Sequence, residues 1–208
     1  AETGTYCLAQ SAQETQINAY LSQVQYWRYQ YSPEDSGVNP NANPGDSLVA
    51  ANTALQQYLL TTPSLNQNLS LNDDMTVSTS DDHKLRIFSW DTETGKDGAH
   101  IYTAIAQYES GSTVKMTVLN DVHKSGVLYP AIYTVASGSN RIYLPVFSRT
   151  DAEKDALQGV QAFSLQNGTL SGTNIIRADN GKKSDKLSYT YDYFSNYDYK
   201  KMKEKYVI

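Results

Sequence analysis

The first third of the chain carries apolar residues at helical spacing. Between Ile17 and Tyr31 they recur at steps of three and four, which places them on one side of a helix. Ser11 and Glu14 have the S-x-x-E spacing of a capping box, in which two side chains satisfy free backbone amides at a helix start. We therefore expect a helix that begins near Ser11 and ends before Pro33.

A proline-rich stretch and a second helix follow. Residues 32–46 contain three prolines and almost no apolar side chains, so they are expected to form a loop. From Asp46 or Ser47 to Leu60 the apolar residues again share one side of a helix, and Pro63 comes shortly after it. The two apolar stripes must be buried, either on the rest of the chain or on a partner.

From about residue 73 the period of the pattern changes to two, which is typical of half-buried strands. Asn167-Gly168 separates two such runs and is the preferred pair for a type I′ hairpin turn. Residues 109–112 and 137–140 carry further hairpin signals, and residues 150–157 are expected to be a helical turn or a long loop. The other expected strands are 75–78, 84–90, 100–108, 113–119, 131–136, 141–147 and 187–194.

These patterns predict an α+β fold of one domain, residues 1–208. An N-terminal helical pair, within residues 8–62, is expected to pack on a seven- to eight-strand antiparallel sheet formed by residues 73–208. The sheet would be a sandwich or an open barrel.

One predicted strand presents two different rows of side chains. Leu85 and Ile87 share one face, and Arg86, Phe88 and Trp90 share the other. If the first row points to the core, the second is either exposed or covered by the helical pair. The covered placement is favoured, because two helices need an apolar floor.

Arginine and large aromatic residues anchor many protein interfaces when they are exposed. The predicted binding residues are therefore Arg86, Phe88, Trp90, Asp91 and Tyr102, which lie in or beside the segments 84–90 and 100–108.

A calcium loop is one alternative for the turn after Trp90. Asp91, Glu93 and Asp97 stand at odd positions with glycines between them, as oxygen ligands do in calcium loops. The closing glutamate is missing, so a polar turn that uses glycine is favoured. The three histidines have no paired spacing for zinc, and we expect no metal or cofactor.

Catalytic motifs do not emerge from the sequence. His83 beside Asp81 and Asp82 could supply a base, but polar strand ends often carry such groups. The chain has no G-x-S-x-G, H-E-x-x-H or S-x-x-K motif. A pair of glycosidase carboxylates stays open, because such a pair is assembled in space. We name no catalytic residue.

Composition limits the partners. The net charge is -5 and no basic stripe is present, which argues against nucleic acid. No apolar run approaches the ~20 residues of a transmembrane helix. The chain has 17 Tyr and only 4 Phe, a usage that suits wet interfaces and an exported protein, although a tyrosine-rich β core explains it equally well. Cys7 is the single cysteine, so no intrachain disulfide forms.

Several short patterns are shared with a group of bacterial proteins. S-D-D, K-L-R-I-F-S-W-D-T-x-T-G, I-Y-T, R-I-Y-L and V-x-A-F-x-L-x-N-G-x-L occur between residues 80 and 171. Together they resemble exported bacterial proteins of unknown function. The resemblance implies a bacterial envelope protein, and it assigns no site residue. Together with the composition, it leads us to expect a periplasmic or secreted protein whose leader has been removed.

The leading hypothesis is a non-catalytic binding protein of the bacterial envelope whose partner is another protein. An inhibitor or immunity protein that blocks the partner is its most specific form. The alternative is a carbohydrate- or peptidoglycan-directed binding module or hydrolase, with cell-wall glycan as the partner. A structural or adhesive module is a third hypothesis.

Overall fold

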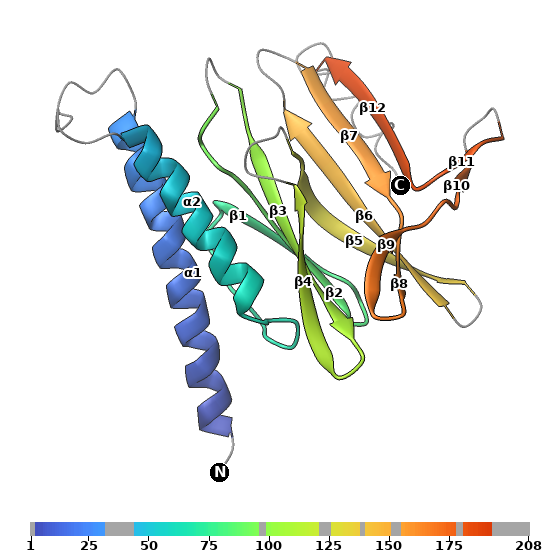
Figure 1. The fold of residues 1–208 in the computed structure, drawn as a ribbon, viewed down its shortest axis with the longest axis horizontal. Helices are drawn as coiled ribbons and strands as arrows, with labels where there is room; N and C mark the ends of the chain where they lie inside the picture. The colour runs from blue at the N-terminus through green and yellow to red at the C-terminus, as the bar shows by residue number, and fades with distance from the viewer. Residues whose placement is uncertain are drawn as a thin grey trace, which may run out of the picture.

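A computed structural model shows two helices followed by β-structure (Figure 1). The helices lie together on one side, and two larger sheets stand beside them. This arrangement confirms the predicted α+β class, with a helical pair and a largely antiparallel sheet. The structure describes residues 3–31, 44–95, 99–120, 126–137, 140–150, 155–177 and 181–192.

Helix α1 spans Thr3–Tyr31 and helix α2 spans Pro44–Thr61. Proline suits the first position of α2, because its missing N–H would have no partner inside the helix. The predicted loop at residues 32–46 lies outside the described residues as far as residue 43, and its last three residues belong to α2. Neither described helix is both long and apolar enough to cross a membrane.

The prediction that the first helix begins near Ser11 was wrong. The helix starts at Thr3, so Ser11 lies inside it and is not an N-cap. Residues 3–10 contain no proline, and the helix continues through them. Glu14, the other half of the expected capping box, accepts a hydrogen bond from the backbone N–H of Ser70 (2.6 Å).

Sheet A contains four antiparallel strands in the order β1-β2-β3-β4. Its strands are β1 Met75–Thr79, β2 Leu85–Asp91, β3 Tyr102–Ser110 and β4 Thr113–Asn120. Each lies within two residues of a predicted segment at both ends, because alternation was clear in all four.

Sheet B is organised around strand β6, which spans Asn140–Thr150. Strand β5 pairs with one edge of β6, and strands β7 and β8 share the other edge. Strand β12 then pairs with β7, and β9 pairs with β8. The remaining strands are β5 Leu128–Ser137, β7 Asp155–Gln161, β8 Phe163–Gln166, β9 Thr169–Gly172 and β12 Lys186–Asp192.

Two features of sheet B differ from the sequence prediction. Residues 150–157 were expected to be a helical turn or a long loop, but strand β7 occupies residues 155–161. Residues 151–154 lie outside the described residues. Its segment D-A-L-Q-G-V-Q has little alternation, and its strand geometry comes from pairing with β6 and β12. A small hairpin of β10 Ile176–Arg177 and β11 Lys183–Ser184 brings the described strands to twelve, more than the seven or eight expected.

The turn between β8 and β9 confirms a local prediction. Asn167 and Gly168 both have positive φ, at 51° and 67°, as a type I′ turn requires. A Cβ on Gly168 would also lie 2.3 Å from the hydroxyl oxygen of Ser110, so this position needs glycine for space as well.

Sheet A is the middle layer of the structure (Figure 1). On one side Leu85 and Ile87 pack with Phe147 and other residues of sheet B. On the other side Phe88 and Trp90 pack with apolar residues of both helices. Residues 85–90 are therefore all buried, and sheet A has a hydrophobic core on each of its faces.

Candidate functional site

The row formed by Arg86, Phe88 and Trp90 lies beneath the helices. Phe88 and Trp90 are 0% and 1% exposed, and both belong to the core shared with α1 and α2. The indole N–H of Trp90 donates a hydrogen bond to Oδ1 of Asn52 on α2 (2.9 Å). These two predicted binding residues therefore hold the helices on the sheet and present no surface to a partner. Arg86, 5% exposed, is described with its pocket below.

Asp91 and Tyr102, the other two predicted binding residues, are paired at one end of sheet A. Asp91 hydrogen-bonds Nδ1 of His100 through Oδ2, and its Oδ1 accepts the backbone N–H of Glu93 (2.9 Å). The His100 ring stacks on the buried Tyr102, with centroids 5.7 Å apart and planes 9° apart. A carboxylate and an aromatic ring thus set the orientation of a half-exposed imidazole.

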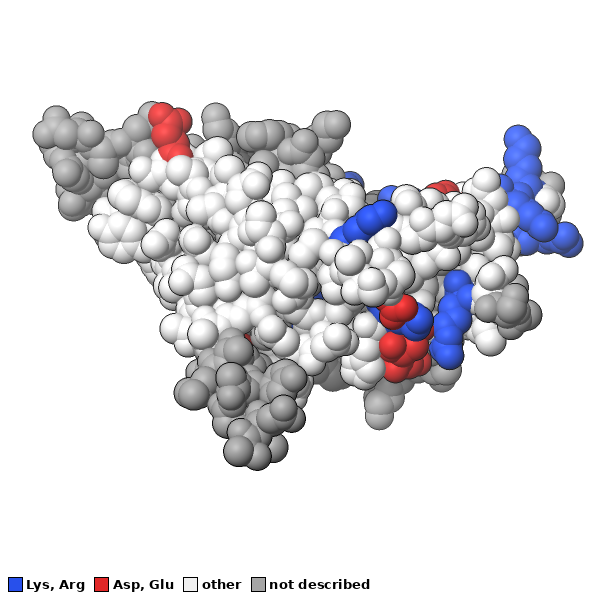
Figure 2. Space-filling view, turned by 60° about the horizontal axis from the view of Figure 1, so that its bottom comes forward, with Lys and Arg blue, Asp and Glu red and all other residues white. Residues whose placement is uncertain are grey.

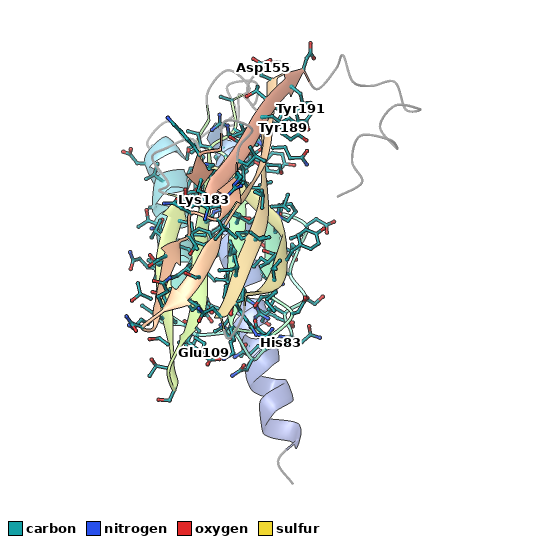
Figure 3. All side chains as sticks on the ribbon, turned by 90° about the vertical axis from the view of Figure 1, so that its right-hand side faces the viewer. His83, Glu109, Asp155, Lys183, Tyr189 and Tyr191 are labelled. Atoms are coloured by element: carbon teal, nitrogen blue, oxygen red, sulfur yellow. The ribbon has the colours of Figure 1, made fainter. Side chains whose placement is uncertain are left out.

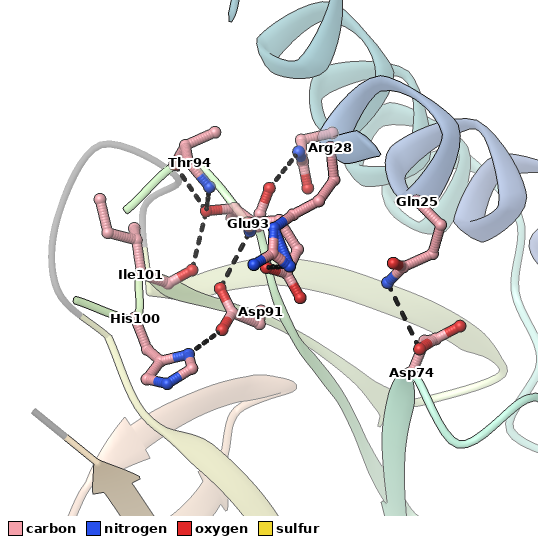
Figure 4. Close-up of polar contacts among 10 residues, drawn as sticks. Gln25, Arg28, Asp74, Asp91, Glu93, Thr94, His100 and Ile101 are labelled. Atoms are coloured by element: carbon pink, nitrogen blue, oxygen red, sulfur yellow. Dashed lines mark hydrogen bonds and ion pairs between the residues drawn. The ribbon is translucent and has the colours of Figure 1, made fainter. Parts of the chain in front are cut away.

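Glu93 connects this end of the sheet to helix α1. Its backbone has a φ of 58°, and its carboxylate forms an ion pair with Nη1 of Arg28 (2.7 Å; Figure 4). Burial and the neighbouring Asp91 raise the pKa of Glu93, and the positive charges of Arg28 and His100 oppose this. The carboxylate has a structural task, which is to anchor the turn to the helix.

The same contacts bear on the calcium and catalytic alternatives. Asp91 already contacts His100 and Glu93 already pairs with Arg28, and Asp97 lies outside the described residues. Within those residues no three His, Cys, Asp or Glu side chains gather to hold a metal.

A histidine oriented by a carboxylate is the arrangement of a general base. Among the described residues, however, no serine or cysteine donates to His100, so this pair shows positioning and no reaction.

His83 does not join its neighbouring carboxylates as a catalytic unit. Asp82 accepts hydrogen bonds from Ser80 (2.8 Å), from the Lys84 backbone N–H (3.2 Å) and from the Tyr143 hydroxyl (3.0 Å). Its carboxylate therefore braces the β1–β2 turn against sheet B. His83 itself is exposed.

The outer face of sheet B is an uncharged feature that the sequence did not reveal. Residues paired directly across antiparallel strands share a face, so the strand registers identify its members. We call this surface the tyrosine face. Its members are Ala131, Tyr133 and Val135 of β5, Ile142, Leu144, Val146, Ser148 and Thr150 of β6, Ala156, Gln158 and Val160 of β7, and Leu187, Tyr189 and Tyr191 of β12. Ile142 and Ala156 are buried.

Several side chains of the tyrosine face are open to solvent. Tyr133 is 53% exposed, Leu187 is 52% exposed and Tyr189 is 49% exposed. Tyr189 and Tyr191 lie side by side on β12, with ring centroids 5.8 Å apart (Figure 3). The Tyr189 hydroxyl donates to Oε1 of Gln158 (2.6 Å), which holds its ring over the neighbouring strand.

Charged residues of these strands occupy the alternate positions. Lys186 and Asp192 of β12 and Arg141 of β6 have the other register and do not belong to the tyrosine face. The end of the molecule that comes forward in Figure 2 is also mostly uncharged over its described surface, with one group of adjacent acidic and basic side chains and a few charged side chains that stand apart. The acidic net charge is thus not gathered on the tyrosine face.

Comparison with protein-family models, with curated proteins and with solved structures finds no match for this chain. The resemblance to exported bacterial proteins therefore stays a prediction.

Proposed function

We propose that the protein is a non-catalytic binding protein that holds another protein against its tyrosine face. The observation that carries this proposal is the composition of that face, where exposed Tyr, Leu and Val side chains occur without a single charged residue. Depletion of charge and enrichment in tyrosine distinguish the centres of protein interfaces from ordinary surface.

The extent of the face fits this role. Four strands at a spacing of about 4.8 Å, and about eight residue steps along β6, cover roughly 400 Å². Contiguous apolar patches of about 300–600 Å² are the largest that ordinary monomers show, and they often mark interaction sites. A polar rim around such a centre would complete an interface of about 800 Å² per partner.

Contacts elsewhere support a non-catalytic role. The described partners of the His100 ring are Asp91 and Tyr102, which orient it and supply no nucleophile. We include in the proposal the setting that the sequence suggests, a periplasmic or secreted bacterial protein. An inhibitor or immunity protein is its most specific form.

Affinity capture with matched variants tests the proposal. The immobilised protein is exposed to envelope and secreted extract of its source, beside the variants Tyr133→Ser and Tyr189→Ser. The control variant Tyr26→Ser removes a tyrosine of α1 that is 56% exposed and lies away from the tyrosine face. We expect one stoichiometric protein on the wild type and on the control, and its loss from both variants of the face.

Three results would contradict the proposal. A captured protein that also stays on the Tyr133→Ser and Tyr189→Ser variants binds elsewhere. Retention of glycan without protein supports the carbohydrate-directed alternative. Sedimentation that shows a dimer broken by Tyr189→Ser identifies a second copy of the chain as the occupant of the face.

A further inference from the structure

A pocket of about 470 Å³ opens at the end of sheet A that carries His83. Its volume lies in the range of about 300–1,000 Å³ that small-molecule sites occupy. A second hollow of about 180 Å³ shares Asn66 and His83 with it and extends to Glu109, near His83 in Figure 3. The polar side chains of the pocket come from two segments of the chain. The segment after α2 supplies Asn66, Gln67 and Asn68, and the β1–β2 hairpin supplies Thr79, His83 and Arg86.

Arg86 forms part of the pocket wall and is 5% exposed. Its Nε donates to the hydroxyl of Thr79 (2.9 Å), its Nη2 donates to the carbonyl of Gln67 (2.7 Å), and its Nη1 donates to the carbonyl of Ser64. Thr79 and Gln67 also line the pocket, so the guanidinium plane lies at its wall. One N–H of Nη2 has no acceptor among the described residues.

The charge of Arg86 has no counter-ion in the described part of the chain. Its four acceptors, two on Ser64 and one each on Thr79 and Gln67, are neutral, and no carboxylate of the described residues lies within ion-pair distance. Two acids of the nearest turn and strand already have cations, Glu109 with Lys84 (2.9 Å) and Asp82 with Arg141 (3.4 Å). Asp81 of that turn is exposed and forms no ion pair with Arg86. Burial lowers the pKa of Arg86, but a guanidinium keeps its charge at neutral pH.

A purely structural role explains the four hydrogen bonds of Arg86 but not its charge. Arg86 ties the segment after α2 to sheet A, and a neutral donor could make similar bonds. An unpaired buried charge costs much more than a buried neutral donor. A negative group in the pocket would offset that cost, and the planar guanidinium is shaped to bind two oxygens of one such group.

We propose that this pocket binds an oxyanion, a carboxylate or phosphate group carried by a small polar molecule. Arg86 supplies the cation at the wall. The Asn66 side chain and the exposed imidazole of His83 contact the rest of the molecule from the rim. His83 is held at the rim by a turn in which its φ is 57° and its backbone N–H donates to the Ser80 carbonyl (2.9 Å). The inference does not depend on the protein partner of the tyrosine face.

Nuclear magnetic resonance of the whole ¹⁵N-labelled chain tests the proposal at the Arg86 Nε–H signal. The probes are glucuronate and inorganic phosphate, with glucose as the neutral probe and chloride at equal ionic strength as the salt control. We expect a saturable shift with at least one oxyanion and none with glucose or chloride. The tighter of the two probes identifies the carboxylate or the phosphate as the preferred group.

Three variants separate binding from folding. Binding to the variants is followed at the backbone amide signals of Asn66 and His83, because Arg86→Lys has no Nε–H signal. Arg86→Lys also loses the planar fork and should weaken binding by about tenfold or more, the loss expected for a charge-assisted hydrogen bond. Asn66→Ala, on the exposed rim, should weaken binding without lowering the melting temperature. Asn140→Ala, an exposed asparagine on β6, should leave binding unchanged.

The proposal is overturned if neither oxyanion gives a saturable shift, or if chloride gives the same shift. It is also overturned if Asn66→Ala binds as tightly as Asn140→Ala and the wild type. If Arg86→Lys does not fold, the comparison of these two asparagine variants decides the question.

Discussion

Replacing Asn52 with leucine tests how the helical pair is attached to sheet A. Asn52 is 1% exposed on α2, and it accepts the indole N–H of Trp90 (2.9 Å). Its amide nitrogen donates to the carbonyls of Leu48 (2.9 Å) and Thr92 (2.8 Å). Leucine has nearly the same shape as asparagine, so Asn52→Leu removes the polar atoms without leaving a large cavity.

The size of the effect follows from the groups left without partners. The Trp90 N–H and the Thr92 carbonyl lose these bonds inside the core, and each unsatisfied buried group costs about 1–3 kcal/mol. Together they cost about 2–6 kcal/mol, and burial of the apolar leucine returns about 1–2 kcal/mol. The difference spans about 0–5 kcal/mol, and from the middle of the two ranges we expect a net loss of about 2–3 kcal/mol, a large share of a typical unfolding free energy of about 5–15 kcal/mol.

Urea unfolding followed by circular dichroism measures this loss. The control is Asn18→Leu on α1, where Oδ1 accepts one exposed hydrogen bond from the Asn72 backbone (3.2 Å). The control should cost no more than about 1 kcal/mol, the net value of a single hydrogen bond. If Asn52→Leu is as stable as the wild type, or loses no more than Asn18→Leu, the reasoning about unsatisfied groups is refuted.

Three further predictions concern buried polar groups. Gln107→Met removes four hydrogen bonds to the end of α2 and the segment after it, and should cost about 2 kcal/mol or more in urea unfolding; a loss below about 0.5 kcal/mol would contradict this. Burial alone would raise the pKa of Asp82, but the hydrogen bonds to its carboxylate lower that pKa overall. The charged Asp82 carboxylate therefore stabilises the fold above its pKa in the unfolded chain, and this stability is lost as the pH falls through its pKa in the folded protein. Asp82→Asn should therefore lose less stability on acidification than the wild type, and equal acid profiles would exclude this role. Burial raises the pKa of Tyr129 from 10.0 to about 12, so its contribution is present below pH 10 and is lost as pH rises toward 12. Tyr129→Phe should flatten that alkaline decline in a pH series of melting temperatures, and an unchanged decline would refute it.

Local pattern was enough to predict that two helices precede the sheet and to predict the strands of sheet A, although it misplaced the start of α1. Alternation and helical spacing are properties of neighbouring residues, so they can be recognised without the rest of the chain. Asn167-Gly168 was predicted for the same reason, because its turn depends on the backbone preferences of two residues. Strand β7 could not be predicted in this way, because its strand geometry comes from partners on both sides.

The sites needed more than local pattern. The sequence selected Phe88 and Trp90 as interface anchors because they are large and aromatic, and those properties also make them the floor of the helical pair. Tyr189 and Tyr191 have the same alternation, yet they face outward. A signal was present in the period-two spacing of Leu187, Tyr189 and Tyr191, but it does not say which face is covered.

The sequence by itself determined which side chains share a face of each helix and strand, and the α+β class followed from that. Only the tertiary structure decided which faces are buried. It covered the Phe88 and Trp90 row with helices, left the tyrosine face open, and placed Arg86 in a pocket wall without a counter-ion among the described residues. The physical reason is that alternation is set along one strand, whereas burial and charge pairing depend on residues far away in the sequence.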